Sequence, residues 1–440
     1  FRIIHNYDNV ITKTDNYIMG FSKPIEQISI NFQGVFMYLK DSIRGDYEMN
    51  ILMLASDFPP NIYGGIGIHV YRLSKELVKM GHSVTVMVIK CHMFIKDQPI
   101  EYTLDGIKVI DFEEDHEKCN QLKYLEELGA KLKVYRVIYN NAIISPLILK
   151  LTKDNLYDII HLHDLYPAIS YVLLQNSAVK ITTIHAMTAP VDSLLDSLRR
   201  YASYNADGVI AVSNAVKDFC KKRYEKDFKY KEIEVIPNGI DVRNKNINFF
   251  RDPVITFCAR LHSSKGCDNL IKAFKIFITD HPQYDYFHLN IIGEGEEFEN
   301  LITLCNKLGV NENVHFLGYI PNNEVRELLG KSYIHCVPSI YEGFGLIALE
   351  AMAEATCLIT SDAGGLADFV VNNENGLTYS ANNVNELAQK LYEIISNPAL
   401  RNALSKKGYE TALRFSWEEI ANKTVKFYNK IINLGQKHIN

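Results

Sequence analysis

The chain lacks the paired cysteines, the long apolar runs and the large net charge that would place it in several common classes. Its eight cysteines occur singly, with no Cys-x-x-Cys pair, which is typical of reduced core residues in a cytoplasmic protein. No run approaches the ~18 apolar residues that a membrane-spanning helix needs. A formal net charge of -5 gives no electrostatic argument for nucleic acid or for an anionic membrane surface. Peripheral membrane contact stays open.

Several catalytic signatures are also missing. The sequence has no Ser-His-Asp order, no Walker loop and no kinase set. Two glycine pairs, Gly65-x-Gly67 and Gly293-x-Gly295, lack the third glycine of the dinucleotide fingerprint and the acidic residue on a following strand. These absences argue against a dehydrogenase. No basic and apolar leader precedes the first polar residues, so we expect no secretion signal in this sequence.

A strand-helix rhythm runs through most of the 440 residues, a length that fits two domains of about 150 to 200 residues each. Nearly continuous apolar strands that alternate with helices predict parallel sheets covered on both faces. The fold class is therefore α/β, with two Rossmann-like, doubly wound domains facing a central cleft. We expect four parts: an N-terminal extension or the tail of an upstream domain (1–48), a first domain (49–240), a second domain (241–415) and a C-terminal helix (416–440).

The stretch from Ile334 to Glu350 carries the strongest local signal. An apolar strand ends at Pro338, and the turn Gly343-Phe344-Gly345 leads into a helix that begins near Leu346. A helix N-terminus presents unpaired N–H groups and a positive dipole, so this turn suits a phosphate. Glu342 and Glu350 flank the turn, and carboxylates beside a phosphate site can accept hydrogen bonds from hydroxyls attached to that phosphate. A sugar nucleotide has such hydroxyls on both sides of its diphosphate.

Two cations lie at the end of the second domain's first strand. Arg260 follows the strand and Lys265 comes five residues later, before Gly266. An arginine fork and a lysine point charge can clamp a diphosphate. The alternative is two solvated loop charges, but their place at a carboxyl end of the sheet that also bears Glu342 favours the clamp.

In the first domain, the turn from Gly64 to Gly67 predicts a backbone approach to a phosphate or sugar, or else a tight packing turn. His161 and His163 could chelate a metal, but no third and fourth ligands are evident, so a metal site is not expected. His185, at another strand end, is interpreted as a hydrogen-bonding residue for a substrate or as a structural histidine. Asp57 and Asp164 could orient an acceptor hydroxyl or cap helices.

Taken in order, these motifs resemble the retaining glycosyltransferases of family 4, the GT-B group that includes relatives of glycogen synthase and sucrose synthase. The likeness extends from about Met49 to Asn433. The hallmark is the pair Glu342 and Glu350 with seven residues between them. The other motifs, in family order, are Gly64 to Gly67, Ile184-His185, Ser213, Ile236 to Asp241, Ala259-Arg260 with Lys265-Gly266, and Gly293-Glu294-Gly295.

The resemblance implies roles for these residues. Arg260 and Lys265 would hold the donor diphosphate with N–H groups of Gly345 and Leu346, Glu342 would face the donor sugar, and Glu350 the ribose. The other residues implied at the donor are His185 beside the sugar, Gly65 and Gly67 over the diphosphate, Tyr319 beside the base, and Gly293, Gly343 and Phe344. The helix after Trp417 would cross back onto the first domain.

Some positions depart from the family. Ala355 and Cys357 stand where relatives commonly have Gly and Pro, Asp368 where Glu is frequent, and Ala186 and Met187 are less typical. By resemblance, these departures lie at a strand entry and in a loop near the donor.

The expected activity is transfer of a hexose from a nucleoside-diphosphate sugar to a hydroxyl acceptor, by an enzyme of the hexosyltransferase class. We expect same-face attack, with the leaving phosphate oxygen taking the acceptor's proton, and no metal or other cofactor because Arg260 and Lys265 neutralise the diphosphate. The alternatives are a GT-B epimerase or phosphorylase, or a non-catalytic sugar-nucleotide binder. The sequence names neither the base, the sugar, the acceptor nor the oligomeric state.

Overall fold

The computed structural model describes residues 48–60, 64–89, 95–96, 98–117, 146, 148–150, 157–163, 178–185, 203–223, 232–242 and 249–437. Contacts divide the chain after Glu48, and Met49–Asn440 form one compact unit. The predicted N-terminal extension lies outside the described residues except for Glu48, and so do Asp164, Ala186 and Met187.

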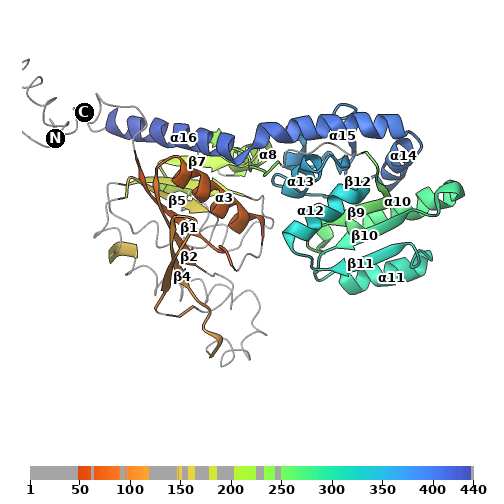
Figure 1. The fold of residues 1–440 in the computed structure, drawn as a ribbon, viewed down its shortest axis with the longest axis horizontal. Helices are drawn as coiled ribbons and strands as arrows, with labels where there is room; N and C mark the ends of the chain where they lie inside the picture. Colours follow the sequence, from red (N-terminus) through yellow and green to blue (C-terminus); the bar gives the residue numbers. More distant parts are fainter. Residues whose placement is uncertain are drawn as a thin grey trace, which may run out of the picture. The chain divides into compact units, whose positions relative to one another are not determined.

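The first half of this unit contains an eight-stranded sheet, in the order β3-β4-β2-β1-β5-β6-β7-β8 (Figure 1). Every neighbouring pair is parallel except β3 and β4. The strands are β1 (Asn50–Ala55), β2 (Ser83–Ile89), β3 (Ile100–Leu104), β4 (Ile107–Phe112), β5 (Ile159–His163), β6 (Val179–Ile184), β7 (Gly208–Ala211) and β8 (Ile233–Val235).

The antiparallel hairpin β3-β4 was not predicted from the sequence. Asp105 and Gly106 form its two-residue turn, with φ of 51° and 81°. An Asp-Gly pair that adopts positive φ at both positions is a strong hairpin signal, so the signal was available.

The second half contains a six-stranded parallel sheet, in the order β11-β10-β9-β12-β13-β14. Its strands are β9 (Asp252–Cys258), β10 (His288–Ile292), β11 (Val314–Gly318), β12 (Ser332–Val337), β13 (Cys357–Ser361) and β14 (Leu377–Tyr379). These two sheets, parallel except for the β3-β4 pair, confirm the predicted α/β fold class with two parallel-sheet domains.

Helices cover both faces of the second sheet. Alternate strand residues enter different cores: Cys336 and Ile359 join one cluster, whereas Val337 and Leu358 join another. This two-sided burial explains why the strands are almost continuously apolar. The described helices are α3 (Gly65–Lys79), α8 (Asn214–Arg223), α10 (Cys267–Asp280), α11 (Phe298–Leu308), α12 (Asn322–Lys331), α13 (Leu346–Ala353), α14 (Val384–Ile395), α15 (Pro398–Ala412) and α16 (Trp417–Lys437).

The last helix, α16, packs on the first sheet. Trp417, Phe427, Tyr428 and Ile431 share a core with residues of β1, β2 and α3, and Figure 1 shows α16 running beside α3. Tyr428 is fully buried and its hydroxyl lies 2.6 Å from Nδ1 of His161. The helix thus ties the end of the chain to the first domain. Among the described helices, none is long and apolar enough to cross a bilayer.

Ala355, between α13 and β13, has a φ of 54°. The left-handed region costs an alanine roughly 1–2 kcal/mol in the folded state. This cost offsets the two advantages of alanine over glycine, which are the burial of its methyl group and the smaller chain entropy that it loses on folding. We therefore expect Ala355→Gly to leave the free energy of unfolding unchanged or slightly raised. The matched change Ala351→Gly, at a buried position inside helix α13, should lower it by more than about 1 kcal/mol. Equal destabilisation in urea titrations of the two variants would contradict this account.

Candidate active site

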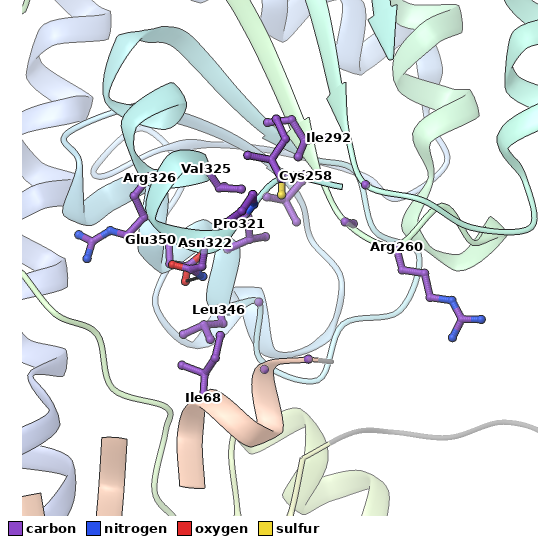
Figure 2. Close-up of a pocket in the computed structure, with 18 of the residues that line it drawn as sticks. Ile68, Cys258, Arg260, Ile292, Pro321, Asn322, Val325, Arg326, Leu346 and Glu350 are labelled. Atoms are coloured by element: carbon purple, nitrogen blue, oxygen red, sulfur yellow. Dashed lines mark hydrogen bonds between the residues drawn. The ribbon is translucent and has the colours of Figure 1, made fainter. Parts of the chain in front are cut away.

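A cavity of about 1300 Å³ is lined by residues of both sheets' domains. Figure 2 shows Ile68 of α3 below Leu346 of α13, and Glu350 and Asn322 above Leu346. The lining includes nine of the residues predicted from the sequence: Gly65, Arg260, Lys265, Gly293, Tyr319, Glu342, Gly345, Leu346 and Glu350. It does not include Gly67, His185, Gly343 or Phe344.

Two helix N-termini approach each other in this cavity. Helices α3 and α13 start after Gly64 and Gly345, and neither start has a side-chain cap or an acidic residue in its first turn. A methyl group added at Gly65 would lie 3.7 Å from Cδ2 of Leu346, so the two ends are nearly in contact. Unpaired N–H groups and two positive dipole ends therefore face the same space, which suits an anion.

Glycine is required at the start of α13. Gly345 has a φ of 93°, and a methyl group there would lie 2.4 Å from Cδ2 of Leu366. Only glycine adopts this conformation without strain. The turn places Gly345 and Leu346 in the lining of the cavity.

Arg260 follows β9 at the carboxyl end of the second sheet. Gly293 packs against this point so closely that a methyl group there would lie 2.0 Å from the carbonyl oxygen of Ala259. The Arg260 side chain is exposed and points away from Glu350 (Figure 2). No described residue forms an ion pair with it, so its guanidinium is available for a ligand.

Lys265 is already paired. Its Nζ lies 2.8 Å from Oε2 of Glu342, and the Oγ of Ser339 donates to the same oxygen at 3.0 Å. The Lys265 and Glu342 side chains are 27% and 13% exposed. The resemblance assigned the lysine to the diphosphate and the glutamate to the sugar, whereas here the two form one unit that fixes the position of both.

Glu350 is almost fully buried on α13. Its Oε1 accepts a hydrogen bond of 3.0 Å from Nδ2 of Asn322, at the start of α12. Burial raises the pKa of the Glu350 carboxyl, and the bond from Asn322 partly opposes that shift. Asn322 was not predicted from the sequence, because its importance comes from a contact 28 positions away.

The other residues predicted to contact the sugar-nucleotide donor differ in their surroundings. Tyr319 is 70% exposed at the cavity rim. The Gly343 carbonyl accepts a 2.6 Å hydrogen bond from Oγ of Ser213, which links the two domains. Phe344 is buried and packs against Phe369 and Phe415. Phe344 therefore supports the turn from behind.

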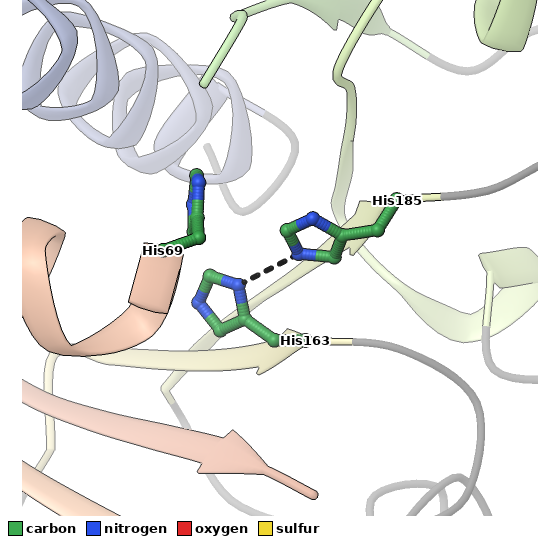
Figure 3. A group of neighbouring side chains, drawn as sticks. All are labelled: His69, His163 and His185. Atoms are coloured by element: carbon green, nitrogen blue, oxygen red, sulfur yellow. Dashed lines mark hydrogen bonds between the residues drawn. The ribbon is translucent and has the colours of Figure 1, made fainter. Parts of the chain in front are cut away.

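His185 belongs to a group of three histidines (Figure 3). Its Nε2 lies 3.3 Å from Nδ1 of His163, and its ring centre lies 4.8 Å from that of His69. Burial lowers the pKa of His69 to about 4 and that of His163 well below its usual value, so both rings are neutral at pH 7. His161 does not join this group, because its nitrogens face Tyr428 and Thr183.

His69 was missed in the sequence because a single histidine on the apolar face of a helix gives no signal of its own. Only the fold brings α3 to the ends of β5 and β6.

Gly67 makes room for Asp57. A methyl group at Gly67 would lie 2.7 Å from the carboxylate Oδ2 of Asp57, whereas one at Gly64 would meet nothing within 4 Å. The carboxylate thus lies against the first turn of α3. We expect Gly67→Ala to lower the free energy of unfolding by about 1–3 kcal/mol through overpacking. Gly64→Ala, the matched control, should change it by less than about 0.5 kcal/mol. Chemical denaturation checks both, and equal effects would refute the contact.

Two family models match adjacent parts of the chain. The model described as glycosyltransferase family 4 matches residues 63–244, and the model described as glycosyl transferases group 1 matches residues 241–411. Together they span both domains and the cavity between them. The chain belongs with the family 4-like glycosyltransferases.

Relatives of this glycosyltransferase are similar along almost their whole length. An uncharacterized glycosyltransferase of Methanocaldococcus jannaschii is 28% identical over 413 residues, which cover 86% of this chain and 98% of the relative. A glycogen synthase of Mycobacterium tuberculosis is 27% identical over 404 residues, or 86% and 94% of the two chains. The structure of sucrose-phosphate synthase from Thermosynechococcus elongatus matches with a TM-score of 0.69 at 21% identity. The match covers 88% of this chain and 100% of that chain. The structural likeness supports the GT-B fold.

Proposed function

We propose that this glycosyltransferase moves a hexose from a nucleoside-diphosphate sugar to a hydroxyl acceptor with retention of configuration. The observation that carries the proposal is the meeting of the N-termini of α3 and α13 in one cavity that also contains Arg260 and Lys265. The four positive features suit a diphosphate, and Glu350 offers an acceptor for hydroxyls nearby.

Charge stabilisation is the main work of such a site. As the bond between the anomeric carbon and the diphosphate oxygen breaks, negative charge builds on the leaving group. Fixed cations and helix-end N–H groups stabilise that charge without reorganisation. The acceptor oxygen then bonds to the same face of the sugar, and its proton passes to the leaving phosphate oxygen.

The reaction as proposed needs no metal, because Arg260, Lys265 and the two helix ends supply the positive charge. Turnover should therefore persist after exhaustive chelation and dialysis. Loss of turnover that Mg²⁺ or Mn²⁺ restores would contradict this part of the proposal.

Named relatives support a transferase that builds glycosides. Glycogen synthase and sucrose-phosphate synthase are named for a glucan and a sugar phosphate, so the comparison supports a sugar donor and a hydroxyl acceptor without fixing either.

Glu350→Ala should raise the KM for the donor about 10-fold or more while changing kcat little, because a ribose contact is the same in ground and transition states. Asn322→Ala should shift the donor KM in the same direction by a smaller factor, since it frees Oε1 of Glu350 to turn. Steady-state kinetics with varied donor measures both. A normal donor KM in Glu350→Ala would contradict the ribose role.

The function is tested by screening sugar nucleotides for a rise in melting temperature, and then incubating the binders with a panel of hydroxyl acceptors. We expect a transfer product and free nucleoside diphosphate. An isomerised donor would indicate an epimerase, dependence on inorganic phosphate a phosphorylase, and binding without turnover a silent binder. Each of these three results would overturn the proposal.

A further inference from the structure

Three histidines from different elements converge near the end of the first sheet. His69 lies on α3, His163 ends β5 and His185 follows β6. Each offers one ring nitrogen, and these nitrogens lie within 4.8 Å of one another. None of the three lines the large cavity, so the proposed diphosphate contacts do not account for this group.

Hydrogen bonds fix how two of these rings present their nitrogens. Nδ1 of His69 lies 2.7 Å from Oδ1 of Asn238, which can only accept, so this nitrogen carries the proton and Nε2 keeps a lone pair. Nε2 of His163 lies 3.2 Å from Sδ of Met53, a weak acceptor without a proton to give. The lone pair of His163 is therefore on Nδ1, the nitrogen that faces His185.

The spacing of the rings fits a shared metal ion. With metal-nitrogen bonds of about 2.0–2.1 Å, two tetrahedral ligand nitrogens lie about 3.3 Å apart and their ring centres about 5.2 Å apart. Nδ1 of His163 and Nε2 of His185 are 3.3 Å apart. The three ring-centre distances are 4.8 Å, 5.3 Å and 5.6 Å. Small ring movements would close the remaining gap.

We propose that His69, His163 and His185 form a binding site for a divalent transition cation of the Zn²⁺ type. Neutral imidazoles suit such ions, whereas Mg²⁺ and Ca²⁺ prefer oxygen ligands. Asn238 acts as the outer partner that orients His69, as is common for metal-ligating histidines. On binding, the Nε2 proton of His185 is exchanged for one on Nδ1, so the ring stays neutral and Nε2 presents its lone pair to the metal.

We expect a metal ion bound to the three histidines also to inhibit sugar transfer. This second part of the proposal rests on the proposed function. His185 is half-buried and is the one member of the group assigned to the donor sugar. A metal that binds Nε2 of His185 would fix the ring toward His69 and His163 and withdraw it from the sugar.

The binding test uses the full chain after chelation and desalting. Co²⁺ is titrated as a spectroscopic stand-in and then displaced with Zn²⁺. We expect one equivalent per chain, with no competition from a large excess of Mg²⁺. His185→Gln and His69→Gln should each weaken binding about 100-fold, and Asn238→Ala about 10- to 100-fold.

The matched control is His315→Gln. His315 and His288 form an exposed pair with nitrogens 3.3 Å apart but belong to no third-ligand group among the described residues. The His315→Gln variant should still bind one equivalent of Co²⁺ per chain tightly. Absence of stoichiometric binding, or unchanged binding in His185→Gln, would overturn the proposal. If His69→Gln does not fold, His185→Gln decides the matter, because a folded His185→Gln protein should no longer gain melting temperature with Zn²⁺.

Inhibition is measured separately, in a transfer assay with and without Zn²⁺. We expect at least a 10-fold loss of turnover that chelation reverses, and less than 2-fold loss in His185→Gln relative to its own metal-free rate. Tight binding without inhibition would remove the regulatory part alone. A chain that binds Zn²⁺ yet transfers no sugar would refute the transferase proposal and leave the metal site standing.

Discussion

Arg260→Ala is expected to lower kcat about 100-fold or more at saturating donor. The guanidinium is exposed at the end of β9, lines the cavity and is not engaged by a described residue, so its charge is available to the leaving diphosphate. Removing one preorganised group that stabilises transition-state charge typically costs 10²–10³-fold in kcat. Initial rates with the donor and acceptor found by the screen measure the effect.

The control for this change is Arg414→Ala, which also removes an exposed arginine from the second half of the chain but lies outside the cavity lining. It should retain kcat within 2-fold. The clamp role of Arg260 would be refuted by a kcat in Arg260→Ala equal to that of this control.

Lys265→Ala is expected to lower kcat/KM about 100-fold, for two reasons that can be separated. The change removes a cation from the proposed diphosphate site and also leaves Glu342, whose side chain is only 13% exposed, without its lysine. An unpaired carboxylate next to an anionic ligand repels it.

Adding Glu342→Gln to Lys265→Ala should therefore recover about 10-fold of the lost donor affinity, although kcat should stay low. The measurement is a double-mutant cycle on donor KM and on kcat. Strictly additive effects would show that Lys265 and Glu342 act independently, against the 2.8 Å pair. Lys272→Ala, which breaks an exposed pair with Asp268, is the control and should change neither constant.

The sequence predicted the two sheets because most of their strands are buried on both faces. The strand β12 is buried along almost its whole length and does not alternate between buried and exposed residues, although it contains Ser332 and His335. The hairpin β3-β4 was missed although Asp105-Gly106 marks its turn. The short edge strand β14 was missed because its three residues, Leu377–Tyr379, give no pattern that distinguishes them from a loop.

The sequence could bring predicted site residues together only where they lie close to one another in the chain. Gly345, Leu346 and Glu350 follow one another along a single turn and helix, so the sequence itself brings them together. Contacts between distant elements could not be predicted in this way. Asn322 of α12 contacts Glu350 of α13 because the second sheet brings these two helices together. His69 of α3 contacts His163 at the end of β5 because α3 packs on the first sheet.

Lys265 and Glu342 show a different limit. The sequence indicated a cation and an acid near a phosphate, but not that the two would pair with each other. Pairing depends on Pro338 and Ser339, which end β12 beside Gly266. A methyl group on Gly266 would lie 2.1 Å from the Pro338 carbonyl oxygen, so the lysine loop and the glutamate turn are in direct contact.

The central claim is glycosyl transfer from a nucleotide sugar with retention. It is tested most directly by following the anomeric carbon by NMR while the full chain converts an α-linked nucleoside-diphosphate sugar and its acceptor. We expect an α-linked product that forms in step with the nucleoside diphosphate. A β-linked product would contradict retention, and a donor that stays unchanged with every acceptor in the panel would contradict the transferase itself.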